Sequence, residues 1–248
     1  MVKGASIRFK SYEETPKKIL ELLKLHNELK KYDKIVIKTF LSSDSEKSTS
    51  VDLAESVLKF CLAHKNPIAE IYLVDGADGE DTEYLFDSQG YKKLSEKYNV
   101  GLVDLNYSDT EVIQEDSFTK FDEIHFPKLL KNSFLISLTK LSHDEETVMT
   151  GSLSNMLGAF PSSKYKGLFS TRKNKIRKWP IKYSIYDILK CKTPNFAVID
   201  SSDKGFILAG LPFELDKNAA KLLEKNWQMI PYLNLIHENT PKEETTKQ

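Results

Sequence analysis

Along the first 110 positions, short runs of adjacent apolar residues alternate with segments in which apolar residues are spaced three or four apart. Short runs of adjacent apolar residues, which are typical of strands buried on both faces of a sheet, occur at 34–40, 69–74 and 100–105. Between these runs, apolar positions spaced three or four apart predict amphipathic helices over about 16–32, 48–65 and 82–98. Strands that alternate with helices of this length predict a parallel sheet with right-handed crossovers.

The second half of the chain continues the alternation and completes the predicted fold. Further strands are expected at 123–126, 132–138, 195–200 and 206–209, and helices at 142–160 and 214–227. Alternating polar and apolar residues at 6–9 predict one edge strand. We therefore expect an α/β fold with a mostly parallel sheet flanked by helices on both faces. Residues 1–239 should form a single domain and residues 240–248 a flexible polar tail.

The segment 142–160 is the most informative stretch for function. Ser142 followed by Glu145 has the spacing of a capping box, which predicts a helix start. One side of such a helix is apolar, and the opposite side carries only small residues, Thr147, Gly151, Ser154 and Gly158. A glycine inside a helix costs roughly 1 kcal/mol relative to alanine. Either close packing of a second element or the approach of a ligand would explain the two glycines, and the sequence does not separate these explanations.

Composition and charge narrow the class of protein. The chain has 248 residues, 40% of them hydrophobic, and 36 Lys+Arg balance 36 Asp+Glu, which excludes a fully disordered chain. No apolar run approaches the ~18 residues of a membrane span, and the N-terminus carries no apolar signal core. We therefore expect a cytoplasmic protein in a reducing compartment, with no membrane partner.

Cysteine and histidine usage argues against a metal site. Cys61 and Cys191 are the two cysteines, far apart and each inside an apolar run. An iron–sulfur cluster takes about four thiolates, so neither a self-contained cluster nor a disulfide scaffold is expected. The five histidines include no pair at metal-ligand spacing, and we expect no metal. The sequence identifies no cofactor.

A local excess of positive charge is hidden by the neutral total. No acidic residue occurs from Thr147 to Tyr186, and the stretch 164–182 carries Lys164, Lys166, Arg172, Lys173, Lys175, Arg177, Lys178 and Lys182. Such a patch attracts phosphate or carboxylate groups, and its interleaved aromatics also suit stacking on single-stranded bases. Nucleic acid is the less favoured partner, because the total charge is zero and no nucleic-acid-binding motif is present. The alternative is a solvated loop whose cations pair with acids elsewhere.

Charged residues follow four of the predicted strands. They are Lys38, Asp75, Asp104 and Asp200. In open α/β sheets ligands bind beyond the carboxyl ends of the strands, which makes these residues candidates for a binding site. Each of them could equally cap a helix or form a turn.

The run from Leu135 to Lys164 contains an ordered set of short motifs. Its key residues are Lys140, Leu141, His143, Thr150, Gly151, Asn155, Gly158, Pro161 and Lys164. In type and spacing they resemble the central signature of the domain of unknown function 362 family, and shorter matches extend the resemblance over about 34–225. The resemblance implies an α/β scaffold with an anion-binding site built from lysine and histidine, in a family without a generally established activity.

The sequence departs from the family pattern at several points. Ser154 stands where the family has a lysine, and the turn before His143 is one residue shorter and lacks its second lysine. A histidine expected soon after Lys164 is absent, as is the cysteine-rich ferredoxin-like module of many longer relatives. The arrangement is also remotely similar to the fold of nickel-dependent lactate racemase, but no prediction rests on that likeness.

The slightly favoured hypothesis is a protein, with enzyme activity left open, that binds a small phosphate- or carboxylate-bearing anion at the strand carboxyl ends. Four side chains are expected to converge on one pocket, Lys38, Lys140, His143 and Lys164. His143 and Lys140 would carry any catalysis, since an imidazole titrates near neutral pH. The remaining lining residues are expected to be Thr150, Gly151, Ser154, Asn155 and Asp200.

The alternative hypothesis is an interaction protein that has kept the fold and lost the activity. Ser154 in place of the family's lysine favours it directly. Neither the ligand, the reaction nor the oligomeric state follows from the sequence.

Overall fold

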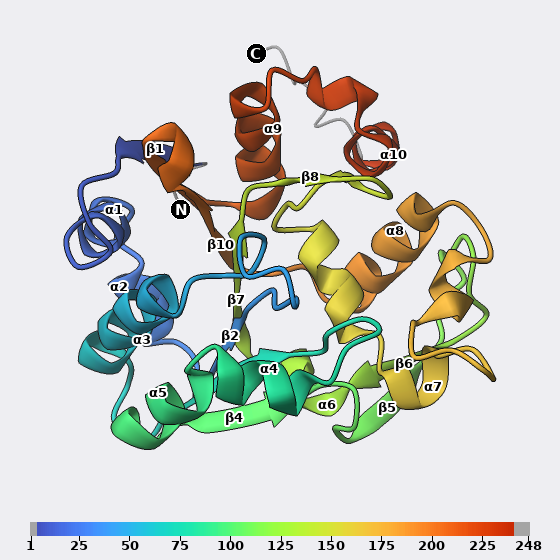
Figure 1. The fold of residues 1–248 in the computed structure, drawn as a ribbon, viewed down its shortest axis with the longest axis horizontal. Helices are drawn as coiled ribbons and strands as arrows, with labels where there is room; N and C mark the ends of the chain where they lie inside the picture. Colours follow the sequence, from blue (N-terminus) through green and yellow to red (C-terminus); the bar gives the residue numbers. More distant parts are fainter. Residues whose placement is uncertain (1–3, 241–248) are drawn as a thin grey trace, which may run out of the picture.

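A seven-stranded sheet forms the centre of the molecule. The structure is a computed structural model that describes residues 4–240. The strand order is β1-β11-β10-β7-β2-β3-β4 (Figure 1). Five strands run parallel, β2 (Lys34–Lys38), β3 (Glu70–Asp75), β4 (Gly101–Asp104), β7 (Phe134–Lys140) and β10 (Phe196–Ser201). They correspond to five runs predicted as strands of a parallel sheet, and that prediction is confirmed.

Two antiparallel strands close one edge of the sheet. β11 (Phe206–Gly210) pairs with β10, and β1 (Gly4–Arg8) pairs with β11 as the outermost strand. The predicted edge strand at 6–9 is therefore confirmed. Residues 241–248 of the predicted tail lie outside the described residues, and the single-domain assignment of 1–239 stays a prediction.

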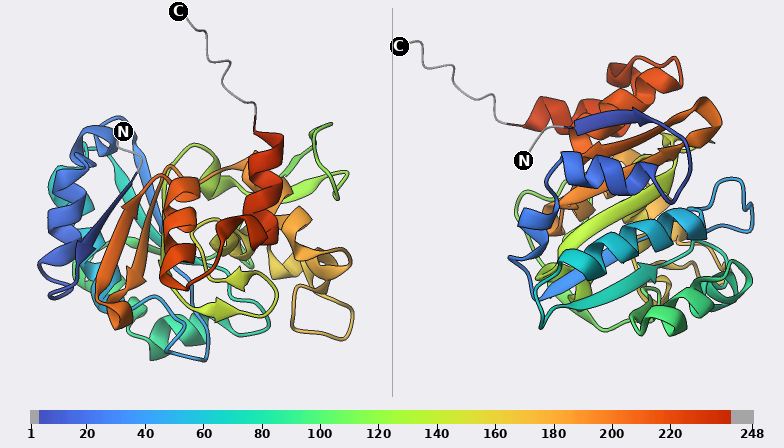
Figure 2. Two further views of the ribbon diagram at one scale, coloured as in Figure 1. Left: turned by 90° about the horizontal axis from the view of Figure 1, so that it is seen from above. Right: turned by 90° about the vertical axis from the view of Figure 1, so that its left-hand side faces the viewer.

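Helices cover both faces of the sheet, as the sequence predicts. One face packs against α1 (Thr15–Leu22), α2 (His26–Leu29), α3 (Val51–His64), α4 (Thr82–Ser88) and α5 (Tyr91–Tyr98). The other packs against α8 (Ile181–Cys191), α9 (Pro212–Leu222) and α10 (Pro231–Asn239). Figure 2 shows α1 and α3 lying across the strands on the first face. None of the helices in residues 4–240 has the length and apolar character needed to cross a bilayer.

Local signals in the sequence explain where these helices begin and end. Pro16 lies in the first turn of α1, where its missing N–H costs nothing. The Ser50 side chain accepts a hydrogen bond from the backbone at the start of α3, and Asp81 does the same for α4. Gly90 has a φ of 86° and separates α4 from α5, so the helix expected over 82–98 is divided in two.

Shorter elements lie between the main strands and helices. A two-stranded antiparallel sheet joins β5 (Thr110–Ile113) to β6 (Ile124–Pro127), and α6 (Lys128–Lys131) leads into β7. The others are α7 (Ser162–Tyr165) and the 3-10 turns η2 (Asn174–Arg177), η3 (Ser202–Lys204) and η4 (Trp227–Met229). The expected strand at 123–126 is therefore present as β6, outside the central sheet.

The helix predicted at 142–160 is wrong. The segment forms a short hairpin of β8 (His143–Asp144) and β9 (Val148–Met149), followed by the 3-10 helix η1 (Ser154–Ala159). Asp144 is the turn former: its Oδ1 atom accepts hydrogen bonds from the backbone N–H groups of Glu146 and Thr147. Side chains that would cap a helix thus close a hairpin turn.

A buried carboxylate fixes the path of the chain between β9 and η1. Asp216 of α9 accepts hydrogen bonds from Ser152 N (2.7 Å), Ser152 Oγ (2.6 Å), Leu153 N (3.1 Å) and the Tyr232 hydroxyl (3.2 Å). Asp216 and the residues that it contacts are buried, and this burial raises the pKa of Asp216 to about 6. The long-range hydrogen bonds outweigh the local helical pattern.

Removal of the Asp216 carboxylate should therefore destabilise the whole fold. The substitution Asp216→Ala removes this acceptor from two buried N–H groups and two hydroxyls, at a cost of roughly 3 kcal/mol or more. Urea unfolding followed by circular dichroism measures the loss. Asp203→Ala, at an exposed aspartate of η3, is the control and should change the unfolding free energy by less than ~0.5 kcal/mol. Equal stability of the two variants would contradict the assignment.

Candidate functional site

A cavity of about 190 Å³ opens at the carboxyl ends of β2 and β3. Its walls come from the segments that follow these strands, from the β8–β9 hairpin with η1, and from the stretch before α8. The charged lining residues are Lys38, Asp75, Asp78, Glu80, Asp144, Glu146, Arg172 and Arg177. The cavity therefore lies where ligands bind in open α/β sheets.

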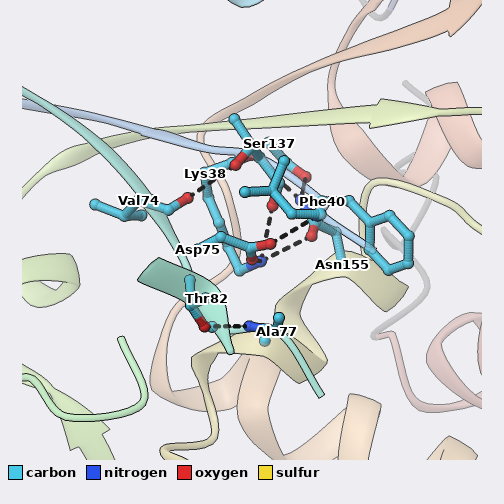
Figure 3. Close-up of polar contacts among 12 residues, drawn as sticks. Lys38, Phe40, Val74, Asp75, Ala77, Thr82, Ser137 and Asn155 are labelled. Carbon is cyan, nitrogen blue, oxygen red and sulfur yellow. Dashed lines mark hydrogen bonds and ion pairs between the residues drawn. The ribbon is translucent and has the colours of Figure 1, made fainter. Parts of the chain in front are cut away.

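Lys38 lies at the floor of this cavity, fully buried at the end of β2. Its Nζ atom donates to Asp75 Oδ1 (2.8 Å), Asn155 Oδ1 (2.7 Å) and the Thr39 carbonyl (3.1 Å) (Figure 3). An ammonium group has three donors, so these three acceptors use all of them. Burial lowers the pKa of Lys38 and the attraction of Asp75 opposes that shift. Lys38 consequently joins the walls of the cavity and has no donor left for a ligand.

Asp75 and Asn155 extend this contact to neighbouring elements. Asp75 Oδ2 accepts a hydrogen bond from Leu41 N at 2.7 Å, which holds the segment after β2 over the sheet. Asn155 Nδ2 donates to Ser137 Oγ of β7 at 2.9 Å. The group formed by Lys38, Asp75 and Asn155, called here the buried triad, thus connects three parallel strands to η1.

The glycines of the 142–160 segment make room for polar groups of the chain itself. A Cβ atom at Gly158 would lie 2.5 Å from Lys38 Nζ and 3.1 Å from Asp75 Oδ1. A Cβ atom at Gly151 would lie 2.5 Å from both Asp216 Oδ2 and the Tyr232 hydroxyl. Of the two explanations the sequence left open, close packing is the one that the structure supports.

Lys173 is a second buried lysine beside the cavity, and sequence reasoning missed its role. Its Nζ atom donates to the carbonyl oxygens of Gly76 (2.7 Å) and Gly158 (3.3 Å), and its side chain has no exposure to solvent. Burial lowers the pKa of Lys173 to about 7. In the sequence it is one of eight cations in the 164–182 stretch, and no local pattern marks it as buried.

Ion pairs neutralise part of the basic stretch at the rim of the cavity. Arg177 contacts Asp78 at 2.6 Å and Glu146 at 2.7 Å. Arg172 lies farther from the same two carboxylates, at 3.8 and 3.7 Å, and 55% of its side chain is exposed. For Arg177 the interpretation as a cation paired with acids elsewhere in the chain is the correct one, whereas Arg172 lies beyond hydrogen-bond distance of the same two carboxylates.

The structure separates the side chains that were expected to converge. Of Lys38, Lys140, His143 and Lys164, only Lys38 lines the cavity. The other three are partly or fully exposed, and His143 Nδ1 lies 2.9 Å from the Val148 carbonyl oxygen. Three lysines and a histidine therefore do not share one cleft within the described residues.

The remaining predicted lining residues divide into two groups. Thr150, Ser154 and Asn155 line the cavity, whereas Gly151 lies behind it against Asp216. Asp200, the penultimate residue of β10, is in register with Lys140 and accepts a hydrogen bond from the Tyr12 hydroxyl at 2.7 Å. Because side chains alternate along a strand, Lys140 belongs to the face of β7 that carries Ile136 and Leu138, which packs against α1 and α3.

The charged residues give no candidate metal centre. No group of three or more His, Cys, Asp or Glu side chains in the described part of the chain is arranged to hold an ion. The expected absence of a metal stays a prediction.

The fold and the cavity define an α/β protein with a small polar site at the carboxyl ends of parallel strands. The chain belongs to the family described as Domain of unknown function (DUF362), whose sequence profile matches residues 35–206. A comparison with curated proteins found no match.

Two solved structures share the fold. The lactate racemase apoprotein from Thermoanaerobacterium thermosaccharolyticum is 17% identical, with a TM-score of 0.60 over 88% of this chain and 56% of that one. A protein from Thermotoga maritima is 14% identical, with a TM-score of 0.51 over 88% of this chain and 61% of that one. The chain thus spans less than two thirds of either structure, and the likeness concerns the fold alone.

Close packing around the buried triad predicts that Gly158→Ala destabilises the protein. The added methyl group would displace Lys38 Nζ from Asp75 and Asn155, at a cost of about 1–3 kcal/mol. Gly4→Ala is the control, because its Cβ would meet nothing closer than 3.6 Å. Urea unfolding of both variants tests this, and an unchanged midpoint for Gly158→Ala would contradict the packing argument.

Burial of Lys173 predicts a rise in stability between pH 7 and 9. In the unfolded chain the lysine keeps its proton up to about 10.5, whereas in the folded chain it loses the proton near 7. In this interval the folded state binds fewer protons, so the unfolding free energy should increase with pH, by about 2 kcal/mol. Asp216, with a pKa of about 6, is already largely ionised here.

The Lys173→Met variant separates this effect from other titrating groups. Lys120, whose pKa burial lowers to about 8, is half exposed and contributes a smaller rise in both proteins. Most of the rise should therefore disappear in the variant. Urea midpoints at pH 7, 8 and 9 give the measurement, and parallel curves for the two proteins would show that Lys173 is not the cause.

Proposed function

We propose that the protein binds a small molecule with a carboxylate or phosphate group in the cavity at the ends of β2 and β3. The observation that carries this proposal is Arg172. It lines the cavity, 55% of its side chain is exposed, and its contacts with Asp78 and Glu146 are long for ion pairs. A planar guanidinium with free donors is well suited to a carboxylate or phosphate.

The volume and lining limit the size of the ligand. About 190 Å³ is below the roughly 300–1,000 Å³ of pockets for drug-sized ligands, so a molecule of few heavy atoms fits best. Thr150 and Ser154 add neutral hydroxyl groups to the wall. In this proposal Arg172 contacts the anion, the role that the sequence had suggested for Lys140 and Lys164. Lys38 holds the walls of the cavity in position.

The alternative of a fold-retaining interaction protein rests on two observations at the same site. All three donors of Lys38 are used by the protein, and the Ser154 hydroxyl accepts from Gly151 N at 2.8 Å. A nucleic-acid partner has less support, because Arg172, Lys173 and Arg177 of the basic stretch contact carboxylates or carbonyls of the chain. The free thiols of Cys61 and Cys191 suit the cytoplasmic location inferred from the sequence.

A ligand panel tests the proposal. Acetate, lactate, sulfate and phosphate should be compared with acetamide, the neutral analogue of acetate; lactate is included because a structural neighbour is named a lactate racemase. At 100 times its dissociation constant a ligand adds ~2.7 kcal/mol, which should raise the melting temperature by roughly 5–10 °C. Acetamide should have no effect.

Two variants locate the binding site within the basic stretch. Arg172→Ala should weaken binding of the responding anion by roughly 10- to 100-fold, as expected for loss of a charged hydrogen bond. Lys178→Ala, at an exposed lysine outside the cavity, should bind like the wild type. If no anion raises the melting temperature of the wild type, the interaction-protein alternative replaces the proposal.

A further inference from the structure

We infer that Lys173 makes anion binding in the cavity proton-coupled: the ligand binds the form of the protein in which this buried side chain is an ammonium ion. The inference rests on the proposed function and adds the residue that determines which charge the cavity accepts. It assigns a specificity role to a side chain that does not itself line the cavity.

Beneath the cavity, two buried lysines lie near one buried carboxylate. Lys38 and Lys173 are both fully buried there, and Asp75 is the buried carboxylate that bonds Lys38 and attracts the proton of Lys173. Lys38 holds Asp75 at 2.8 Å, whereas no carboxylate of the described residues lies within 4.0 Å of Lys173 Nζ. Among the fully buried groups, the two protonated lysines then carry one positive charge more than Asp75 balances, and a buried unpaired charge is costly. Four further carboxylates line the cavity itself, Asp78, Glu80, Asp144 and Glu146, and Arg172 and Arg177 face two of them, Asp78 and Glu146.

The ammonium group of Lys173 lies against the backbone that forms the cavity wall. Lys173 Nζ donates to the carbonyl oxygens of Gly76 and Gly158, and both glycines line the cavity. A Cβ atom at Gly76 would lie 2.4 Å from the Gly158 carbonyl oxygen, so the two backbones are in contact. The ammonium thus lies directly behind the wall, where an anion in the cavity would supply the missing negative charge.

Several other charged groups face Lys173. Asp75 at the end of β3, Asp78 beyond it and Asp104 of β4 attract its proton, and Lys38 of β2 repels it. Asp78 is already paired with Arg177 of η2, whose Nη1 atom donates to the Lys173 carbonyl. Burial outweighs these attractions and lowers the pKa of Lys173 to about 7.

The direction of the pH effect follows from this balance. An anion stabilises the ammonium form, so binding raises the pKa of Lys173 and takes up a proton from solution near pH 7. Above pH 7 the competent fraction of the free protein falls about tenfold per unit of pH, and the apparent dissociation constant rises in proportion. Binding of a titration-silent anion should therefore be about tenfold weaker at pH 8 than at pH 6.

Calorimetry with acetate and sulfate tests the inference, since neither anion titrates between pH 6 and 8. The wild type should lose about tenfold in affinity over this interval and take up protons at pH 7, as detected in two buffers of different ionisation enthalpy. Lys173→Met should bind weakly with a dissociation constant independent of pH. Lys178→Met, at an exposed lysine, should retain the wild-type pH dependence.

A second measurement does not depend on the stability of the variant. In wild-type protein labelled with carbon-13 at the lysine Cε positions, one resonance should titrate near pH 7 and move to higher pH with acetate. Equal affinity at pH 6 and 8, or no lysine resonance that both titrates near pH 7 and moves with acetate, overturns the inference and leaves the proposed function intact. Absence of binding at both pH values by every anion of the panel, acetate, lactate, sulfate and phosphate, overturns both.

Discussion

The buried ion pair between Lys38 and Asp75 is the constraint on which the site depends. Two charges removed from water cost several kcal/mol each, and their mutual attraction offsets this only when the remaining donors and acceptors are satisfied. Asn155, the Thr39 carbonyl and Leu41 N meet that requirement. η1 must therefore lie against the sheet ends, the segment after β2 must fold over them, and position 158 has no room for a side chain. The cavity is the space that these requirements leave.

The parts of the fold that the sequence predicts well are those with a burial pattern that only one structure satisfies. β7 shows this: Ile136 and Leu138 pack on one face, Leu135 packs on the other, and a run apolar on both faces fits a central parallel strand. The 142–160 segment fails the same kind of reasoning. Met149, Leu153 and Met156 are buried as a helical period suggests, but in a hairpin and a 3-10 turn. Asp216, more than sixty residues away, determines that conformation, and no window of local sequence contains it.

The candidate site also contains residues that the sequence can predict and residues that it cannot. Lys38 could be found because a charged residue at the end of an apolar strand is conspicuous, and Asn155 because it belongs to an ordered motif. Lys140 satisfies the same two criteria, yet it does not line the cavity. Lys173 lacks any signal, because its burial depends on a long-range contact with Gly76 and Gly158. Charge and spacing identify candidates, and only the packing of distant segments decides which of them meet.

The same charge balance gives a physical reason for the departure at position 154. The family pattern places a lysine there, next to Asn155, whose Oδ1 atom accepts a hydrogen bond from Lys38. A lysine at 154 would add a third cation to the fully buried Lys38 and Lys173, against two buried carboxylates, Asp75 and Asp216. Like charges in a buried site disfavour each other's ionised forms. Serine avoids that repulsion, since its hydroxyl accepts from Gly151 N and donates to the Met149 carbonyl. Serine at position 154 therefore causes no repulsion with the buried ammonium group of Lys173, which lies behind the wall of the cavity.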